Sequence, residues 1–286
     1  MVALELMNHS PITHIFAIDL DGTLYTEKKQ ISNRSRESIK RASNEGIQPI
    51  IATGRGPHGA EIALEKLGID LPYICSAGAM IRSGIQGKVI YANTFHNHSH
   101  LQKMIDFARQ TDTALLAELP SGELRYFGSS KSLEIIDDQT ATELSHNAQT
   151  GNPDKDFDLP LLKFTLVASR DRLDDFREMV NQSKMGYNMV ISGAQFLDLT
   201  APGTNKGTAL EYYAKYMGIS PENIASIGDQ EIDIHMLNYS GTKFAMQNAV
   251  PELKEIAQVI TPSNEDEGVE WAIDYLLESL TVGNVG

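Results

Sequence analysis

The fold is decided by the stretch Ile15–Leu24, which has the sequence IFAIDLDGTL. Its opening apolar residues run directly into Asp19 and Asp21, which are separated by one position and followed by Gly22. This pattern predicts a buried strand that ends in a loop. Because side chains alternate along an extended chain, the two aspartates can face the same way while Leu20 turns aside into the core. The stretch therefore predicts two carboxylates at the exit of a buried strand.

Two like charges at a buried strand end are unfavourable unless a cation or a proton compensates them. A divalent metal ion is the simplest explanation. A calcium loop of the helix-loop-helix kind also begins with Asp-x-Asp, but it needs a preceding helix and a glycine at its sixth position. Here a strand precedes and the glycine is fourth. A polar strand-to-turn junction without function remains the alternative for this stretch taken alone.

The composition predicts a globular protein with room for two packed cores. The chain has 286 residues, of which 41% are hydrophobic and 22% charged. Its formal net charge of −14 opposes binding to nucleic acid or to an anionic membrane surface. Cys75 is the only cysteine, so no intramolecular disulfide is possible, and we expect a cytoplasmic protein. We find no secretion signal and no apolar stretch long enough to span a membrane.

Strands and helices alternate at both ends of the chain, which predicts a parallel sheet with right-handed crossovers. The expected elements of this part are a helix over 32–45 with Ser32 as its N-cap, strand 47–52, helix 57–67, strand 73–76, helix 205–217, strand 223–227, helix 232–239, strand 243–246, helix 251–257, strand 259–260 and helix 269–280.

The middle of the chain has a different pattern. From about Gly84 we expect strands at 88–92, 113–118, 123–127 and 161–168, helices at 99–110 and 172–183, and a hairpin of 187–191 with 195–200. Such a mixed pattern is typical of an antiparallel or mixed sheet. The predicted architecture is α/β, with a Rossmann-like parallel-sheet core from residues 1–83 and 202–286 and an inserted α+β domain from residues 84–201.

In open parallel sheets, ligands bind outside the carboxyl ends of the strands. Asp19, Asp21, Thr53 and Asp229 all follow predicted strands of the core and fall at that edge. Carboxylates, a hydroxyl and the helix-start Lys206 suit phosphoryl transfer, because a metal and a cationic side chain must neutralise the phosphoryl oxygens during attack. Mg²⁺ prefers oxygen ligands such as carboxylates.

In this interpretation one aspartate of the opening stretch attacks phosphorus, and a second protonates the leaving alcohol and later activates water. The Thr53 hydroxyl and the Gly54 amide would bind phosphoryl oxygens, since a glycine lets the backbone approach closely.

Four motifs of the chain resemble those of the haloacid dehalogenase superfamily, in the same order and in the same strand contexts. They are Asp19–Thr23 (DLDGT), Ala52–Arg55 (ATGR), Lys206 before Gly207, and Gly228-Asp229 with Asp233. The insert between the second and third motifs resembles the α/β cap of the Cof-type phosphatases. Asn248-Ala249 and the segment 264–269 also resemble that group.

The resemblance implies an Mg²⁺-dependent phosphatase with Asp19 as nucleophile and Asp21 as general acid and base. The implied metal ligands are the Asp19 and Asp229 carboxylates and the Asp21 backbone carbonyl, with Asp233 acting through water. The implied phosphate ligands are the Leu20 amide, Thr53, Gly54 and Lys206, and Arg55 and Asn248 are possible additional site residues.

The chain departs from the family pattern at three places. Ile232 stands where the family usually has an asparagine whose amide reaches the phosphate, and Ile232 cannot donate that hydrogen bond. Gln247 and Ala77 replace a usual glycine and a usual asparagine. A lost hydrogen bond to a charged group is worth roughly 1.5 to 3 kcal/mol, so we expect weakened turnover rather than none.

Several alternatives stay open on the sequence. Arg55 could contact the substrate or pair with a nearby carboxylate. His96, His98 and His100 alternate as in a zinc site, although a solvated segment before a helix is favoured. The expected substrate is a small phosphorylated metabolite such as a sugar phosphate, beneath an insert that closes over the site. Phosphomutase-type transfer and a weakly active phospho-ligand-binding protein are the rival functions, and the oligomeric state is unknown.

Overall fold

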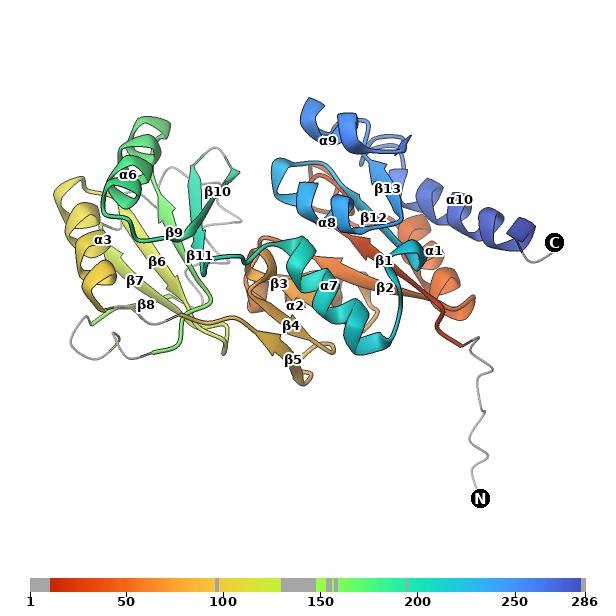
Figure 1. The fold of residues 1–286 in the computed structure, drawn as a ribbon, viewed down its shortest axis with the longest axis horizontal. Helices are drawn as coiled ribbons and strands as arrows, with labels where there is room; N and C mark the ends of the chain where they lie inside the picture. Colours follow the sequence, from red (N-terminus) through yellow and green to blue (C-terminus); the bar gives the residue numbers. More distant parts are fainter. Residues whose placement is uncertain are drawn as a thin grey trace, which may run out of the picture.

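The chain forms two lobes, shown by a computed structural model that describes residues 11–95, 98–129, 148–152, 156, 159–193 and 195–283. Figure 1 shows a larger lobe built from both ends of the chain and a smaller lobe built from its middle. The chain passes between the lobes along two neighbouring connections. Asn93 Nδ2 in the first connection donates to Thr204 Oγ1 in the second at 2.8 Å, so the two connections are tied together.

An eight-stranded sheet forms the centre of the larger lobe, in the order β14-β13-β12-β1-β2-β3-β4-β5. The strands from β14 to β3 run parallel, and β4 and β5 continue the sheet in antiparallel fashion. The strands are β1 (His14–Ile18), β2 (Ile47–Ala52), β3 (Tyr73–Cys75), β4 (Met80–Arg82), β5 (Val89–Ala92), β12 (Ile224–Gly228), β13 (Thr242–Ala245) and β14 (Val259–Ile260). The predicted α/β class is confirmed.

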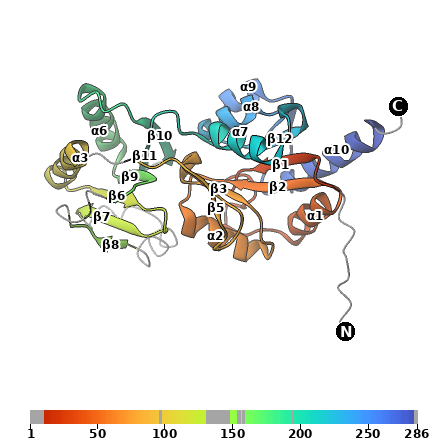
Figure 2. The ribbon, with the colours of Figure 1, turned by 60° about the horizontal axis from the view of Figure 1, so that its bottom comes forward.

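Helices cover both faces of this sheet. Figure 2 shows α7, α8 and α9 on one side and α1 and α2 on the other. The helices are α1 (Asn33–Asn44), α2 (Pro57–Leu67), α7 (Lys206–Met217), α8 (Ile234–Tyr239), α9 (Pro251–Ile256) and α10 (Gly268–Gly283). Ser32 caps α1 as predicted, because its hydroxyl accepts from the Ser35 amide at 2.9 Å.

The smaller lobe has its own sheet, in the order β10-β11-β9-β6-β7-β8. Its helices α3 (His98–Gln110) and α6 (Arg170–Gln182) lie on the face away from the larger lobe (Figure 1). A separate apolar core fills the space between them and the sheet. The strands are β6 (Ala114–Glu118), β7 (Leu124–Gly128), β8 (Ala148–Thr150), β9 (Lys163–Val167), β10 (Asn188–Gly193) and β11 (Phe196–Thr200).

One strand lies in a different lobe from the one predicted. We assigned 88–92 to the insert, but β5 pairs with β4 in the larger sheet. The sequence pattern does become antiparallel here, yet antiparallel strands can extend the edge of a parallel sheet, so the change marks no domain boundary. We propose that the insert begins after β5, near Phe95, and ends near Ala201. No helix within the described residues combines the length and apolar character needed to cross a membrane.

Candidate active site

Asp19 lies at the centre of the large sheet's carboxyl edge. It directly follows β1, which has β12 on one side and β2 on the other, and its amide donates to the Ile227 carbonyl at 3.1 Å. Strand β12 ends at Gly228, so Asp229 emerges at the same edge, and Asp233 follows in a short 3₁₀ turn. Carboxylate oxygens of Asp19, Asp229 and Asp233 lie within 4.8 Å of one another, and all three residues are buried.

Lys206 connects two of these carboxylates. It is the first residue of α7, where Asn205 caps the helix by accepting from the Thr208 amide. Its fully buried Nζ lies 2.6 Å from an oxygen of Asp19 and 2.6 Å from an oxygen of Asp233. The other oxygen of Asp233 accepts from the Asp229 and Gln230 amides at 3.1 Å. Asp233 is therefore suited to orienting Lys206 and the loop after β12.

The cluster carries more negative than positive charge. Burial raises the pKa of Asp19 well above its ordinary value, the charge of Asp233 raises it further, and Lys206 opposes both. Burial, followed by the charge of Asp233, raises the pKa of Asp229 to about 6. Burial disfavours the Lys206 charge, but Asp19 and Asp233 outweigh this effect and raise its pKa. An all-oxygen donor set with excess negative charge fits a hard divalent cation such as Mg²⁺.

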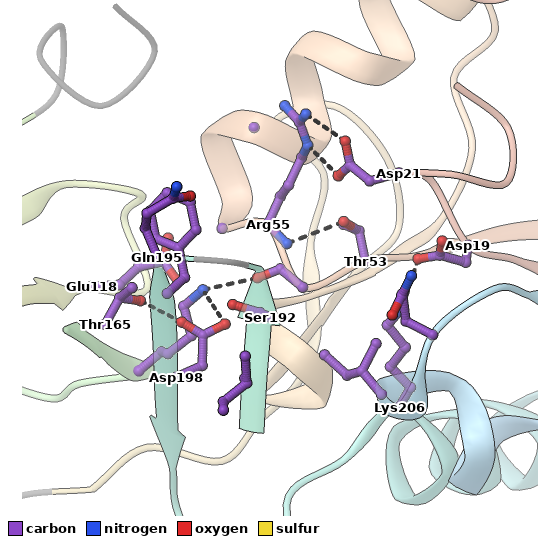
Figure 3. Close-up of a pocket in the computed structure, with 18 of the residues that line it drawn as sticks. Asp19, Asp21, Thr53, Arg55, Glu118, Thr165, Ser192, Gln195, Asp198 and Lys206 are labelled. Atoms are coloured by element: carbon purple, nitrogen blue, oxygen red, sulfur yellow. Dashed lines mark hydrogen bonds and ion pairs between the residues drawn. The ribbon is translucent and has the colours of Figure 1, made fainter. Parts of the chain in front are cut away.

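The predicted phosphate loop follows β2 and faces a cavity between the lobes. Thr53 is buried, and its hydroxyl oxygen accepts from the Arg55 amide at 3.1 Å. The cavity has a volume of about 930 Å³, and residues of both lobes line it (Figure 3). Asp19, Thr53, Gly54, Lys206 and Asp229 all contribute to its lining. The structure thus brings these sequence-predicted residues together at one site.

Asp21 is placed differently from its neighbour Asp19. Its carboxylate accepts two hydrogen bonds from the Arg55 guanidinium, each at 2.7 Å. Figure 3 shows Asp21 turned toward Arg55, whereas Asp19 lies beside Lys206. Of the two alternatives for Arg55, the structure has the ion pair with a carboxylate. The two aspartates line the same cavity, but each is held by its own basic partner.

Three other sequence-selected residues have clear positions. Leu20 is fully buried in the large-lobe core. Asn248 donates to the Gly22 carbonyl at 2.8 Å and accepts from the Asn264 amide, so it braces the loop after Asp21. Ile232 lines the cavity and lies over Gly54. An apolar side chain thus occupies the place beside the phosphate loop where the family pattern has an amide.

The histidine run and two aromatic residues near the cavity have the following positions. His96 lies outside the described residues, and α3 already begins at His98, so this part of the run is not extended. Within the described part of the chain, the only cluster suited to a metal is the aspartate triad. Phe127 is buried in the small-lobe core, while Phe196 lines the cavity.

Sequence reasoning missed a buried polar cluster on the smaller lobe. It consists of Glu118, Lys163, Thr165 and Asp198, all of which line the cavity. A signal was present, because Lys163 and Asp198 interrupt the apolar strands LLKFTLV and FLDLT. Charged residues are rarely buried unless they are paired, so their position within such strands indicates a specific partner.

Comparison with known proteins identifies the family of the chain. A family model for haloacid dehalogenase-like hydrolases matches residues 16–273. The chain is 31% identical over 284 residues to 5-amino-6-(5-phospho-D-ribitylamino)uracil phosphatase YwtE of Bacillus subtilis (strain 168), covering 91% of this chain and 97% of that protein. It is 28% identical over 267 residues to pyridoxal phosphate phosphatase YbhA of Escherichia coli (strain K12), covering 90% and 96%.

A solved structure supports the same relationship. The haloacid dehalogenase-like hydrolase from Bacteroides thetaiotaomicron matches with a TM-score of 0.79 and 25% identity, covering 92% of this chain and 99% of that one. The chain belongs to the haloacid dehalogenase-like hydrolases, in their Cof-type branch, and the predicted resemblance is confirmed. The family is one of hydrolases, and the two relatives named above are phosphatases.

The buried cation of the site generates a stability prediction. We expect Lys206→Met to lower the free energy of unfolding by about 3 to 5 kcal/mol, because it leaves buried carboxylates without their counter-charge. Adding Asp233→Asn should recover part of this loss. Urea unfolding with a chelator present measures both changes. The control is Lys215→Met, an exposed lysine of the same helix, for which we expect no measurable change in the free energy of unfolding. Equal stability of Lys206→Met and the wild type would contradict the account.

Proposed function

We propose that the chain is an Mg²⁺-dependent phosphatase that hydrolyses small phosphomonoesters, such as sugar phosphates, through an aspartyl-phosphate on Asp19. The observation that carries the proposal is the position of Asp19. Its carboxylate lies at the sheet edge beside Lys206, close to Asp229, on the lining of a cavity between the lobes. This arrangement presents a nucleophile together with the positive charge that a phosphate dianion needs.

The proposed reaction has two displacements. An Asp19 carboxylate oxygen attacks phosphorus, the bond to the ester oxygen breaks, and Asp21 gives that oxygen its proton. Asp21 then takes a proton from water as the water oxygen attacks phosphorus, which breaks the Asp19–phosphorus bond and releases inorganic phosphate. Because Asp21 is paired with Arg55 in this structure, Asp21 must leave or share that ion pair when the substrate enters.

The acidic groups provide the proposed metal site. Carboxylates of Asp19 and Asp229 and the Asp21 backbone carbonyl would hold Mg²⁺, with Asp233 acting through water. When bound, Mg²⁺ would neutralise charge on the phosphoryl oxygens. Thr53, the amides of Gly54 and Leu20, and Lys206 would bind the same oxygens from the protein side. Arg55 and Asn248 contribute indirectly in this proposal, through Asp21 and the loop after it.

Small metabolites are the proposed substrates. A cavity of about 930 Å³ has the size of a small-molecule site, and residues of the smaller lobe form part of its lining. The relatives named above are phosphatases of a phosphorylated ribitylaminouracil and of pyridoxal phosphate, which are both compact monoesters. The formal net charge of −14 disfavours nucleic acid as a partner. With its single cysteine buried in β3, the chain suits the reducing cytoplasm.

Two rival functions are tested by the same assay. Transfer of the phosphoryl group to a sugar, as in phosphomutases, would yield a new ester instead of free phosphate. A weakly active protein that binds a phosphorylated ligand is favoured by the Asp21–Arg55 ion pair and by Ile232 beside the phosphate loop. Release of free phosphate over repeated turnovers distinguishes hydrolysis from both.

Nucleophile and acid variants test the proposed roles. With Mg²⁺, the wild type should release phosphate from p-nitrophenyl phosphate and from sugar phosphates, and Asp19→Asn or a chelator should abolish release. Asp21→Asn should lower kcat/KM on sugar phosphates by about 10² to 10⁴-fold. The loss of kcat/KM should be smaller on p-nitrophenyl phosphate, whose leaving group departs without a proton. The control is Asp274→Asn on α10, whose carboxylate pairs with Arg41 and does not line the cavity. Turnover retained by Asp19→Asn would contradict the mechanism.

Ile232 provides a gain-of-function test. Because its side chain lies over Gly54, an asparagine at this position can present an amide to a bound phosphoryl group. We expect Ile232→Asn to raise kcat/KM by about tenfold, which corresponds to about 1.4 kcal/mol and lies near the worth of a hydrogen bond to a charged group. Ile232→Val is the matched control without a donor. Equal kcat/KM values for the two variants would show that the missing amide does not limit turnover.

A further inference from the structure

Four polar side chains share the open face of the smaller lobe's sheet. In β9, Phe164 and Leu166 face the helix-covered core, so Lys163 and Thr165 point the other way. Lys163 pairs in register with Glu118 of β6, and Thr165 with Asp198 of β11. Strand alternation therefore aligns these residues toward the larger lobe, and all of them are buried.

Asp198 makes its hydrogen bonds within the smaller lobe. Asp198 accepts from the Thr165 hydroxyl at 2.6 Å and from Lys163 Nζ at 3.3 Å. Figure 3 shows Asp198 beside Thr165. These bonds fix the Lys163 ammonium in position, but they do not reach the phosphate loop.

Lys163 and Glu118 also contact the larger lobe. Lys163 Nζ donates to the Gly54 carbonyl at 2.8 Å. Glu118 accepts from the Ser76 hydroxyl at 2.6 Å, and its carboxylate lies so close to Gly56 that a Cβ there would overlap it. The contacts to Gly54 and Gly56 fall on the loop Thr53–Gly56, and the contact to Ser76 falls on the turn that supports this loop.

The supporting turn is itself strained. Ser76 and Ala77 have φ values of 49° and 57°, which lie in the left-handed region that is unfavourable for residues other than glycine. In this conformation the Ser76 amide donates to the Arg55 carbonyl at 2.7 Å and the Ala77 amide to the Thr53 carbonyl at 3.2 Å. The turn thus holds the loop from the larger lobe, and Glu118 holds the turn through Ser76.

Lys163 acts on the peptide group that sets the Thr53 hydroxyl. The carbonyl of the Gly54–Arg55 peptide accepts from Lys163, and its N–H donates to Thr53 Oγ1. Because the Thr53 oxygen already accepts that bond, its own proton is directed elsewhere, which in the proposed function is toward a phosphoryl oxygen. A rotated peptide would remove this constraint on the hydroxyl.

We propose that Lys163 and Glu118 are positioning residues of the phosphate site, which fix the loop Thr53–Gly56 from the smaller lobe when the two lobes are together. The proposal rests on the proposed function for its link to turnover. In this proposal, phosphate affinity depends on Lys163 and Glu118, although neither side chain needs to touch phosphate. The smaller lobe then completes the phosphate site as well as covering it.

Charge-matched variants test Lys163. Lys163→Met removes the bond to Gly54, Asp198→Asn keeps it, and the double variant Lys163→Met/Asp198→Asn restores the original charge balance of the cluster. For each we would measure kcat and KM on p-nitrophenyl phosphate, the dissociation constant of inorganic phosphate with Mg²⁺ by calorimetry, and thermal unfolding. If Lys163→Met does not fold, the double variant is measured in its place.

Phosphate affinity and turnover should follow the Gly54 contact. We expect Lys163→Met and the double variant to weaken phosphate binding and to lower kcat/KM, each by about 10- to 100-fold. Asp198→Asn keeps an oxygen that can accept from Lys163 and Thr165, so its phosphate affinity and kcat/KM should stay within about threefold of the wild type. Recovery of wild-type affinity in the double variant, or unchanged affinity in Lys163→Met, would overturn the role of Lys163.

Glu118 is tested by a conservative pair. Glu118→Gln retains an oxygen that can accept from Ser76 and should stay near the wild type, whereas Glu118→Leu should weaken phosphate binding about tenfold. Equal affinities of the two variants would overturn the role of Glu118. If the wild type binds phosphate without hydrolysing esters, the affinities still test the positioning role while the proposed function fails. A wild type that neither binds nor hydrolyses overturns both.

Discussion

The Lys206 ammonium, buried between Asp19 and Asp233, is the interaction on which the rest of the structure depends. Buried carboxylates repel one another, and each additional one costs more unless a cation balances it. The carboxylates come from both ends of the chain. Strand β1 near its start and strand β12 near its end are parallel neighbours, so the residues that follow them leave the sheet at the same edge. The pair of strands, the capped start of α7 and the turn at Asp233 all serve to place four charges.

The second lobe adds constraints that the sheet edge alone does not supply. A loop after a parallel strand has few partners of its own, and Thr53–Gly56 is held instead by a strained turn on one side and by buried side chains of the insert on the other. Glu118 and Lys163 are buried, and each has a hydrogen-bond partner across the lobe boundary, Ser76 for Glu118 and Gly54 for Lys163. Lobe contact and phosphate-site geometry are therefore parts of one hydrogen-bonded network.

The elements of the larger lobe could be predicted from the sequence because short stretches of neighbouring residues identify them. An apolar strand followed directly by Asp19, and an asparagine cap directly before Lys206, identify both the elements and the edge where they meet. Strand β4 and the place of β5 were missed, since three- and four-residue strands give little periodicity and their pairing depends on distant neighbours. The partner of Arg55 and the Lys163 contact with Gly54 also depend on tertiary placement. The sequence left two alternatives open for Arg55, and it showed Lys163 only as an unexplained charge in an apolar strand.

The central claim is that acidic groups from both ends of the chain share one cation opposite Lys206. A crystal structure of the protein soaked with Mn²⁺ as a stand-in for Mg²⁺, with the ion located by its anomalous signal, tests this most directly. The account predicts one ion about 2.0 to 2.3 Å from carboxylate oxygens of both Asp19 and Asp229. An ion bound elsewhere, or one that Asp229 does not contact, would contradict it.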